Sequence, residues 1–114
     1  MTNRVQTAPA SGAHLVQLLL PLGRPGGARF PAQLYRDVTR ELTERFGGVT
    51  AYNRAPASGL WEEEPGRTER DDIVVYEVMV DALDTAWWAH YRRILERRFE
   101  QDELVVRAQP MQRL

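Results

Sequence analysis

Four short stretches of the chain carry the residue pattern of β-strands. Residues 14–20 are mostly apolar, and residues 73–80 are rich in β-branched and aromatic side chains. Both compositions are typical of strands that are buried in a protein core. Two shorter stretches, at 49–54 and 103–108, show the same bias. We therefore expect four strands.

Two longer stretches have apolar residues at helical spacing instead. In residues 31–46 these lie at positions 34, 35, 38, 42 and 46, and in residues 84–100 they lie at positions 87, 88, 91, 94, 95 and 99. This spacing predicts two amphipathic helices. Pro31 suits the first turn of the first helix and Asp84 suits the start of the second. Gly47 follows the first helix, where glycine readily adopts the left-handed conformation that ends a helix.

The two predicted helices also share an apolar template. Aligning Phe46 with Phe99 also pairs Leu42 with Leu95, and both helices end in Arg-Phe before a strand. The order of elements is β-α-β-β-α-β, and two similar halves in this order are typical of the ferredoxin-like fold. We predict an α+β sandwich in which a four-stranded antiparallel sheet carries two helices on one face.

Outside this repeat, two segments have the composition of loops. Residues 1–13 lack the apolar run of a signal peptide, and we expect a disordered lead before a single domain at 14–114. The connection 55–72 is long for a hairpin. It contains Trp61, between a Pro/Ala/Ser/Gly run and three glutamates. Because a solvated tryptophan leaves a large apolar area in water, we expect Trp61 to pack on a partner subunit or over the edge of its own sheet.

Alternation along the strands assigns their residues to two faces of the sheet. The even-numbered residues of 73–80 are uniformly apolar, which places them under the helices. The opposite, open face then has Gln17, Tyr52 and Glu77, with Arg54 or Arg107 nearby. Its apolar positions are Leu15, Leu19, Val75, Met79 and Val105. An apolar face of this size usually marks a partner or a ligand, so we predict a homodimer in which two sheets pack face to face.

The order of elements and the apolar open face resemble the dimeric α+β barrel branch of ferredoxin-like domains. The stretch "RFGGVTAYNRAPASGLW" is similar to small bacterial proteins of that kind whose function is unknown. The resemblance covers roughly residues 14–109. That branch includes small monooxygenases, isomerases, heme-handling enzymes and pure binding domains, so the resemblance implies no single activity.

Composition excludes several kinds of chemistry. The chain has no cysteine, which removes disulfides and thiolate chemistry, and its fifteen basic residues are all arginine, which removes Schiff-base and P-loop lysines. The net charge of −1 gives no electrostatic reason to expect a nucleic-acid partner. The longest apolar stretch, 18–22, is too short to cross a bilayer. We expect a soluble, cytoplasmic bacterial protein with neither a nucleic-acid nor a membrane partner.

Glu77 is the leading candidate for catalysis. A carboxylate between Val75 and Met79 on a half-buried sheet suits general acid or base work. A structural ion pair with Arg54 or Arg107, within one chain or across the dimer, explains the same residue and is the commoner case.

Two further residues could act together with Glu77. His90 lies at the edge of the second helix's apolar stripe and could move protons near neutral pH, although an exposed histidine without a role is more common. Tyr52 would position a substrate. These side chains predict a small-molecule site between the open face and the second helix. The remaining ligand-binding candidates are Gln17, Arg54, Arg107 and Met79.

The sequence predicts neither a metal nor a cofactor. The two histidines have no metal-binding spacing, and the acidic residues at 62–72 do not follow the EF-hand order. The aromatic residues of the second helix are expected in the core rather than around a ligand. Arg45 and Arg98 fall in the last turns of their helices, and we expect both to extend to solvent, an anion site being the alternative.

Two functional interpretations remain open. The first is a homodimer with a small-molecule pocket on the open face, of the kind found in a cofactor-free monooxygenase or isomerase. The second is a non-catalytic binding or assembly module whose open face is only a dimer interface. A cavity that reaches Glu77 favours the first, and a closed interface filled by the apolar residues of the open face favours the second.

Overall fold

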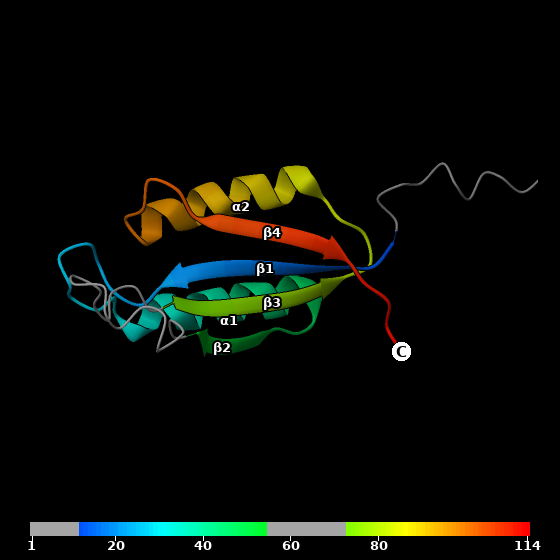
Figure 1. The fold of residues 1–114 in the computed structure, drawn as a ribbon, viewed down its shortest axis with the longest axis horizontal. Helices are drawn as coiled ribbons and strands as arrows, with labels where there is room; N and C mark the ends of the chain where they lie inside the picture. The colour runs from blue at the N-terminus through cyan, green and yellow to red at the C-terminus, as the bar shows by residue number, and fades with distance from the viewer. Residues whose placement is uncertain (1–11, 55–72) are drawn as a thin grey trace, which may run out of the picture.

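The computed structural model of the protein describes residues 12–54 and 73–114 (Figure 1). They form the predicted order of elements. The strands and helices are β1 (His14–Pro21), α1 (Ala32–Phe46), β2 (Thr50–Arg54), β3 (Ile73–Val80), α2 (Thr85–Arg98) and β4 (Val105–Pro110). Trp61 and the lead before Gly12 lie outside the described residues, as does the side chain of Arg54.

The four strands form one sheet in the order β2-β3-β1-β4, and each neighbouring pair is antiparallel. Figure 1 shows the strands in this order from bottom to top, with α1 behind the sheet and α2 beside β4. Two helices on one face of an antiparallel sheet confirm the predicted ferredoxin-like α+β sandwich.

The core lies between the sheet and the helices. Even-numbered residues of β1 and β3 point into it, as the alternation predicts. Phe99, which follows α2, is fully buried and its ring contacts those of Phe30 and Tyr35, at centroid distances of 5.2 and 5.3 Å. The repeat that aligned Phe99 with Phe46 therefore marks core positions, since Phe46 also packs against the core.

The helix ends follow the sequence signals. The Asp84 side chain accepts a hydrogen bond from the backbone N–H of Trp87 at 3.1 Å and so caps α2. At the end of α1, Gly47 has φ 90° and its N–H donates to the carbonyl of Thr43 at 2.8 Å. Helix α2 ends at Arg98, two residues before the predicted end, because Glu100 adopts a left-handed φ of 54°.

The last strand begins later than predicted, at Val105 instead of 103. The backbone N–H of Leu104 donates to a side-chain oxygen of Glu96 on α2 at 3.0 Å. This N–H is therefore bonded to the helix and not to a neighbouring strand. Leu104 is buried in the core all the same. The strand extends to Pro110 instead, and Val105 and Arg107 lie on the open face as predicted.

Candidate functional site

One row of residues crosses the open face of the sheet from edge to edge. The strand register pairs Gln17 of β1 with Glu77 of β3 on one side and with Arg107 of β4 on the other. Thr50 of β2 continues the row beyond Glu77. Since facing residues of neighbouring strands lie about 5 Å apart, these side chains are within reach of one another.

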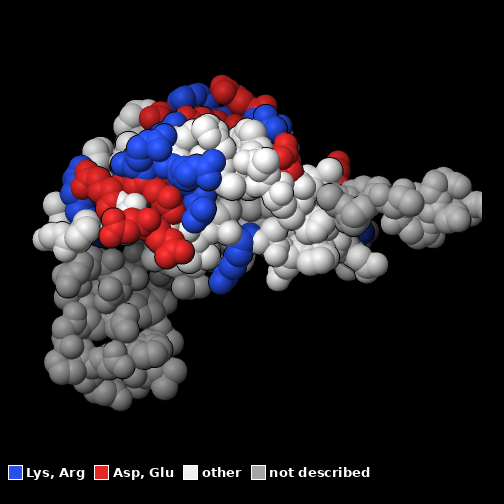
Figure 2. Space-filling view, turned by 90° about the horizontal axis from the view of Figure 1, so that it is seen from above, with Lys and Arg blue, Asp and Glu red and all other residues white. Residues whose placement is uncertain are grey.

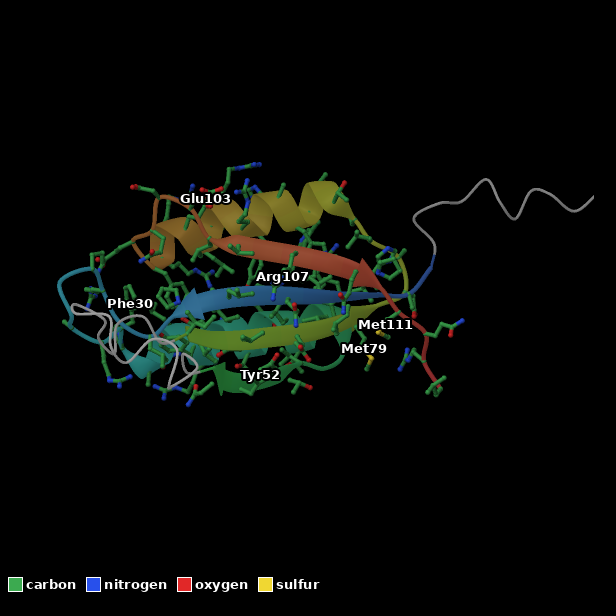
Figure 3. The ribbon with its side chains drawn as sticks, in the orientation of Figure 1. Phe30, Tyr52, Met79, Glu103, Arg107 and Met111 are labelled. Atoms are coloured by element: carbon green, nitrogen blue, oxygen red, sulfur yellow. The ribbon has the colours of Figure 1, made fainter. Side chains whose placement is uncertain are left out.

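Three hydrogen bonds connect Gln17, Glu77 and Arg107 of this row with Tyr52 of β2. The Gln17 amide donates from Nε2 to Oε2 of Glu77 at 2.7 Å, and its Oε1 accepts from Nε of Arg107 at 2.9 Å. The hydroxyl of Tyr52 donates to the same Glu77 oxygen at 3.0 Å. Figure 3 shows Tyr52 and Arg107 on the sheet face turned to the viewer. We call Tyr52, Glu77, Gln17 and Arg107 the polar row.

The polar row changes the expected pairing of Glu77. Among the described side chains no ion pair joins Glu77 to Arg107, because Gln17 lies between them and bonds to both. The direct Glu77–Arg107 pair proposed as an alternative is therefore absent within one chain. Both described hydrogen bonds on Glu77 fall on Oε2, which leaves Oε1 available to a ligand.

Apolar side chains lie on both sides of the polar row. Met79 and Val105 are 51% and 49% exposed, and Leu15 and Leu19 are half-buried. Val75 differs from the expectation, because it is only 1% exposed and offers almost no surface to a partner. The open face is thus apolar at its rim, while Val75 is withdrawn from solvent.

A pocket of about 580 Å³ lies at one end of this face and reaches Glu77. Thr50 and Met79 line it from the sheet, and the turn after α1 forms another wall. Asp81 and Arg113 also line the pocket, and their side chains form an ion pair at 3.8 Å. Its lining therefore combines apolar side chains with charges of both signs.

Thr50, Asp81 and Arg113 were missed as site residues at the sequence level. Thr50 could have been found from the register, since it lies on the predicted open face. Arg113 had no sequence signal, because it follows the last strand. It reaches the pocket because the chain after β4 stays beside β1, where the N–H of Met111 donates to the carbonyl of Ala13 at 3.1 Å.

The structure does not bring His90 to the other two catalytic candidates. His90 is exposed on α2, and both helices cover the face of the sheet opposite to Glu77 and Tyr52. The predicted site between the open face and the second helix is therefore wrong. His90 lies far from Glu77 and Tyr52 because α2 packs on the face that carries the even-numbered strand residues. A helix on that face cannot also border the opposite, open face.

A second polar cluster, missed by the sequence analysis, joins the two helices. Arg98 of α2 donates to both carboxylate oxygens of Glu41 of α1, at 2.8 and 2.7 Å. The hydroxyl of Tyr91 donates to the same carboxylate at 2.7 Å. Arg98 is thus paired across the helices, which corrects the expectation that it extends freely to solvent.

Burial and charge act on this cluster in opposite directions. Burial is the largest influence on Glu41 and raises its pKa, but the hydrogen bonds from Arg98 and Tyr91 outweigh it and leave the pKa below its usual value. Burial, and then the Glu41 carboxylate, raise the pKa of the Tyr91 hydroxyl. The hydrogen bond to Glu41 raises the pKa of Arg98 above its usual value. The cluster therefore holds its charges in place and acts as a clamp between the helices.

Arg45 is exposed, as expected, and it also packs against aromatic rings. Its guanidinium carbon lies 4.4 Å from the ring centre of Trp87 and 5.6 Å from that of Phe46. Trp88 stacks on Phe46 at 5.1 Å. The aromatic residues of α2 thus pack against α1 and the core, as predicted.

Among residues 12–54 and 73–114, no group of three or more His, Asp or Glu side chains could hold a metal ion. Neither described helix has the length and the apolar composition needed to cross a membrane. Figure 2 looks onto the side of α2 and β4, where acidic and basic side chains lie next to one another.

No family model, curated protein or solved structure matches this chain.

Proposed function

We propose that this protein binds a small molecule in the pocket that reaches Glu77. The observation that carries the proposal is the pocket itself, whose volume of about 580 Å³ lies within the usual range of small-molecule sites. Glu77 is held at its border by Gln17 and Tyr52, so the carboxylate has a defined orientation before any ligand arrives.

The arrangement suits proton transfer. Tyr52 and Gln17 occupy one oxygen of Glu77, and the other can accept a proton from a bound substrate. Proton abstraction by a carboxylate is a step that a cofactor-free isomerase or monooxygenase can use. In this proposal Glu77 is the base, Tyr52 and Gln17 are positioning residues, and Arg107 orients Gln17. His90 has no part in it, because it lies on the other side of the sheet.

We also propose that two copies of the chain pair through their open faces. Exposed Met79, Val105 and Tyr52 support this pairing, since their apolar surface would leave water. The polar row supports it as well. A twofold axis that runs parallel to β1 and passes over Gln17 would place Glu77 of one protomer over Arg107 of its partner, and Leu15 and Leu19 over their own counterparts.

The alternative function is a non-catalytic assembly module, in which the pocket would be closed when two copies pair. If pairing fills the pocket with side chains of the partner, no ligand can reach Glu77. A binding experiment can therefore distinguish the two functions, provided that it is done at a protein concentration at which the chain is dimeric.

A fragment screen followed by amide chemical shifts tests the binding site. We expect fragments that shift the amides of Thr50, Glu77 and Met79, with affinity weakened about threefold or more in Glu77→Gln. Glu44→Gln is the matched control, since this carboxylate is exposed on α1 and outside the pocket. The proposal fails if no fragment shifts these amides, or if both variants bind equally well.

A further inference from the structure

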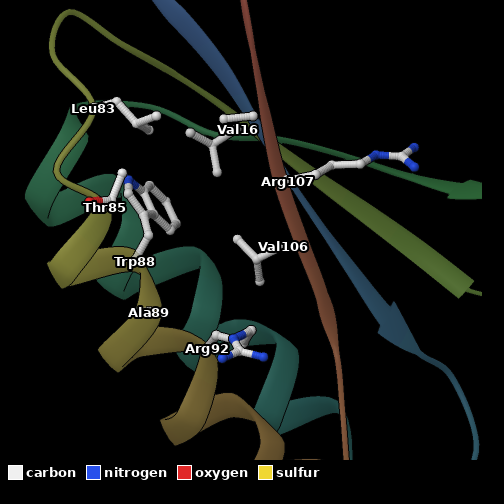
Figure 4. Close-up of a pocket in the computed structure, with 9 residues that line it drawn as sticks. Val16, Leu83, Thr85, Trp88, Ala89, Arg92, Val106 and Arg107 are labelled. Atoms are coloured by element: carbon white, nitrogen blue, oxygen red, sulfur yellow. The ribbon is translucent and has the colours of Figure 1, made fainter. Parts of the chain in front are cut away.

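A second hollow lies on the other side of the sheet, between α2 and β4 (Figure 4). Its volume is about 370 Å³. In the close-up, Val16, Val106 and Trp88 project into the space between the helix and the strand, whereas the side chain of Arg107 points away from it. The apolar residues that line it are Val16, Leu83, Trp88, Ala89, Val106 and Ala108.

The groove exists because two of its wall residues are small. Ala89 on α2 and Ala108 on β4 both end at Cβ, so neither fills the space between the helix and the edge strand. Protein interiors normally close such gaps with larger side chains. Val16 and Trp88 form the floor, and both are buried. The result is an apolar groove between α2 and the edge strand β4.

Arg92 gives this apolar groove a charged end. Thr85 and Arg92 both line it and are seven residues apart on α2, so they lie about 10 Å apart along the helix axis. Figure 4 shows Arg92 extending from α2 toward β4. Arg107, the other arginine of the lining, is turned to the open face, where its Nε bonds to Gln17. Arg92 is therefore the charged side chain that faces a ligand in the groove.

Arg92 has an ion-pair partner, but most of its N–H donors remain available to an anion. Its side chain is 35% exposed, and its ion pair with Glu96 is long, at 3.4 Å. The same Glu96 oxygen also accepts the N–H of Leu104 at 3.0 Å, so it is shared between two donors. A guanidinium has five N–H donors, and this single contact leaves most of them for a carboxylate.

We propose that the groove binds a small amphipathic anion, with an apolar chain or ring over Trp88 and Val106 and a carboxylate at Arg92. The volume fits a small ligand, the lining favours an apolar body, and Arg92 selects a negative end. This site goes beyond the function proposed for the Glu77 pocket, because the two lie on opposite faces of the sheet and share no lining residue.

Titration with octanoate, a straight-chain carboxylate, tests the proposal by amide chemical shifts. Octanoate should shift the amides of Ala89, Val106 and Ala108, and octylammonium, with the same chain and the opposite charge, should bind at least about tenfold more weakly. Arg92→Gln should weaken octanoate binding by a similar factor, while Arg93→Gln, the neighbouring exposed arginine outside the groove, should not.

Filling the groove gives an independent test. Ala89→Leu should abolish the octanoate shifts while cooperative thermal unfolding shows that the fold is intact, and Ala86→Leu on the exposed side of α2 should leave binding unchanged. The proposal is overturned if Ala89→Leu still binds, if octylammonium binds as well as octanoate, or if Arg92→Gln and Arg93→Gln behave alike. It is also overturned if a second copy of the chain, rather than octanoate, shifts these amides as the protein concentration rises.

Discussion

At the scale of single residues, Glu41 is the best-connected carboxylate in the described part of the chain. It accepts two hydrogen bonds from Arg98 and one from Tyr91 at the boundary between α1 and α2. Tyr91 is buried, and the side chains of Glu41 and Arg98 are 27% and 29% exposed. Removing the carboxylate leaves a buried hydroxyl and a guanidinium without their acceptor. The clamp therefore contributes to the packing of the two helices as well as to local pairing.

Glu41→Ala should destabilise the fold by about 2–3 kcal/mol, because hydrogen bonds to charged groups are worth more than neutral ones. Glu44→Ala on the same helix should cost at most about 0.5 kcal/mol, since its contact with Arg40 is an exposed pair at 4.0 Å. The midpoint of urea unfolding measures both changes. Equal midpoints for the two variants would show that the clamp adds nothing to stability.

The pH dependence of stability should carry the signature of the same residue. Since the pKa of folded Glu41 is lowered, its contribution is present above the ordinary carboxyl pKa and is lost as the pH falls through the lower folded value. The stability gap between the native protein and Glu41→Gln should therefore shrink between neutral pH and acidic pH. Urea midpoints measured across this range test it, and a gap that stays constant would contradict it.

At the scale of elements, the turn that ends α1 illustrates how a single backbone conformation sets a boundary. Gly47 has φ 90°, where side chains other than glycine are strained, and a Cβ placed there would meet no neighbouring atom. Conformation, not crowding, explains why glycine suits this position. The same turn lines the pocket beside Glu77, so the end of α1 also shapes the candidate site.

Gly47→Ala should therefore cost about 1 kcal/mol of stability. Gly48→Ala, one residue later, should cost less, because Gly48 is not in the left-handed region and its Cβ would also lie in open space. Thermal unfolding of the two variants measures the difference. A loss in Gly48→Ala as large as that in Gly47→Ala would be evidence against the conformational explanation.

At the scale of the whole molecule, the open face is the surface through which we propose that two copies of the chain pair. In the proposed homodimer, Glu77 of one protomer would lie over Arg107 of its partner, and Leu15 and Leu19 would lie over their own counterparts. Both edges of the sheet, β2 and β4, lack a further strand within the described residues. The proposed face-to-face arrangement would cover apolar surface of the open face and would leave these edges unpaired.

Val105→Glu should convert the proposed dimer to a monomer, because a charge at the apolar rim would be buried without a partner. Ala86→Glu adds the same charge to an exposed position of α2, away from the open face, and should leave the assembly unchanged. Sedimentation equilibrium gives the molar mass of each variant. A native protein that is already monomeric at high concentration would rule out the pairing.

Most of the fold could be predicted because its signals are local. Helical spacing, strand composition, Asp84 and Gly47 each act within a few residues, and the structure follows them closely. Strand alternation also placed Gln17, Glu77 and Arg107 on one face, and the register confirms this. The role of Trp61, by contrast, stays a prediction, because it lies outside the described residues.

The sequence by itself determined the order of elements, the two faces of the sheet and the residues available on each, because spacing along the chain sets these. Only the tertiary structure decided which of those residues meet. Gln17 bridges Glu77 and Arg107, and Glu41 receives Arg98, because of strand register and helix packing between segments far apart in the chain. The same packing separated His90 from Glu77, since a sheet between two side chains keeps them apart whatever their pattern in the sequence.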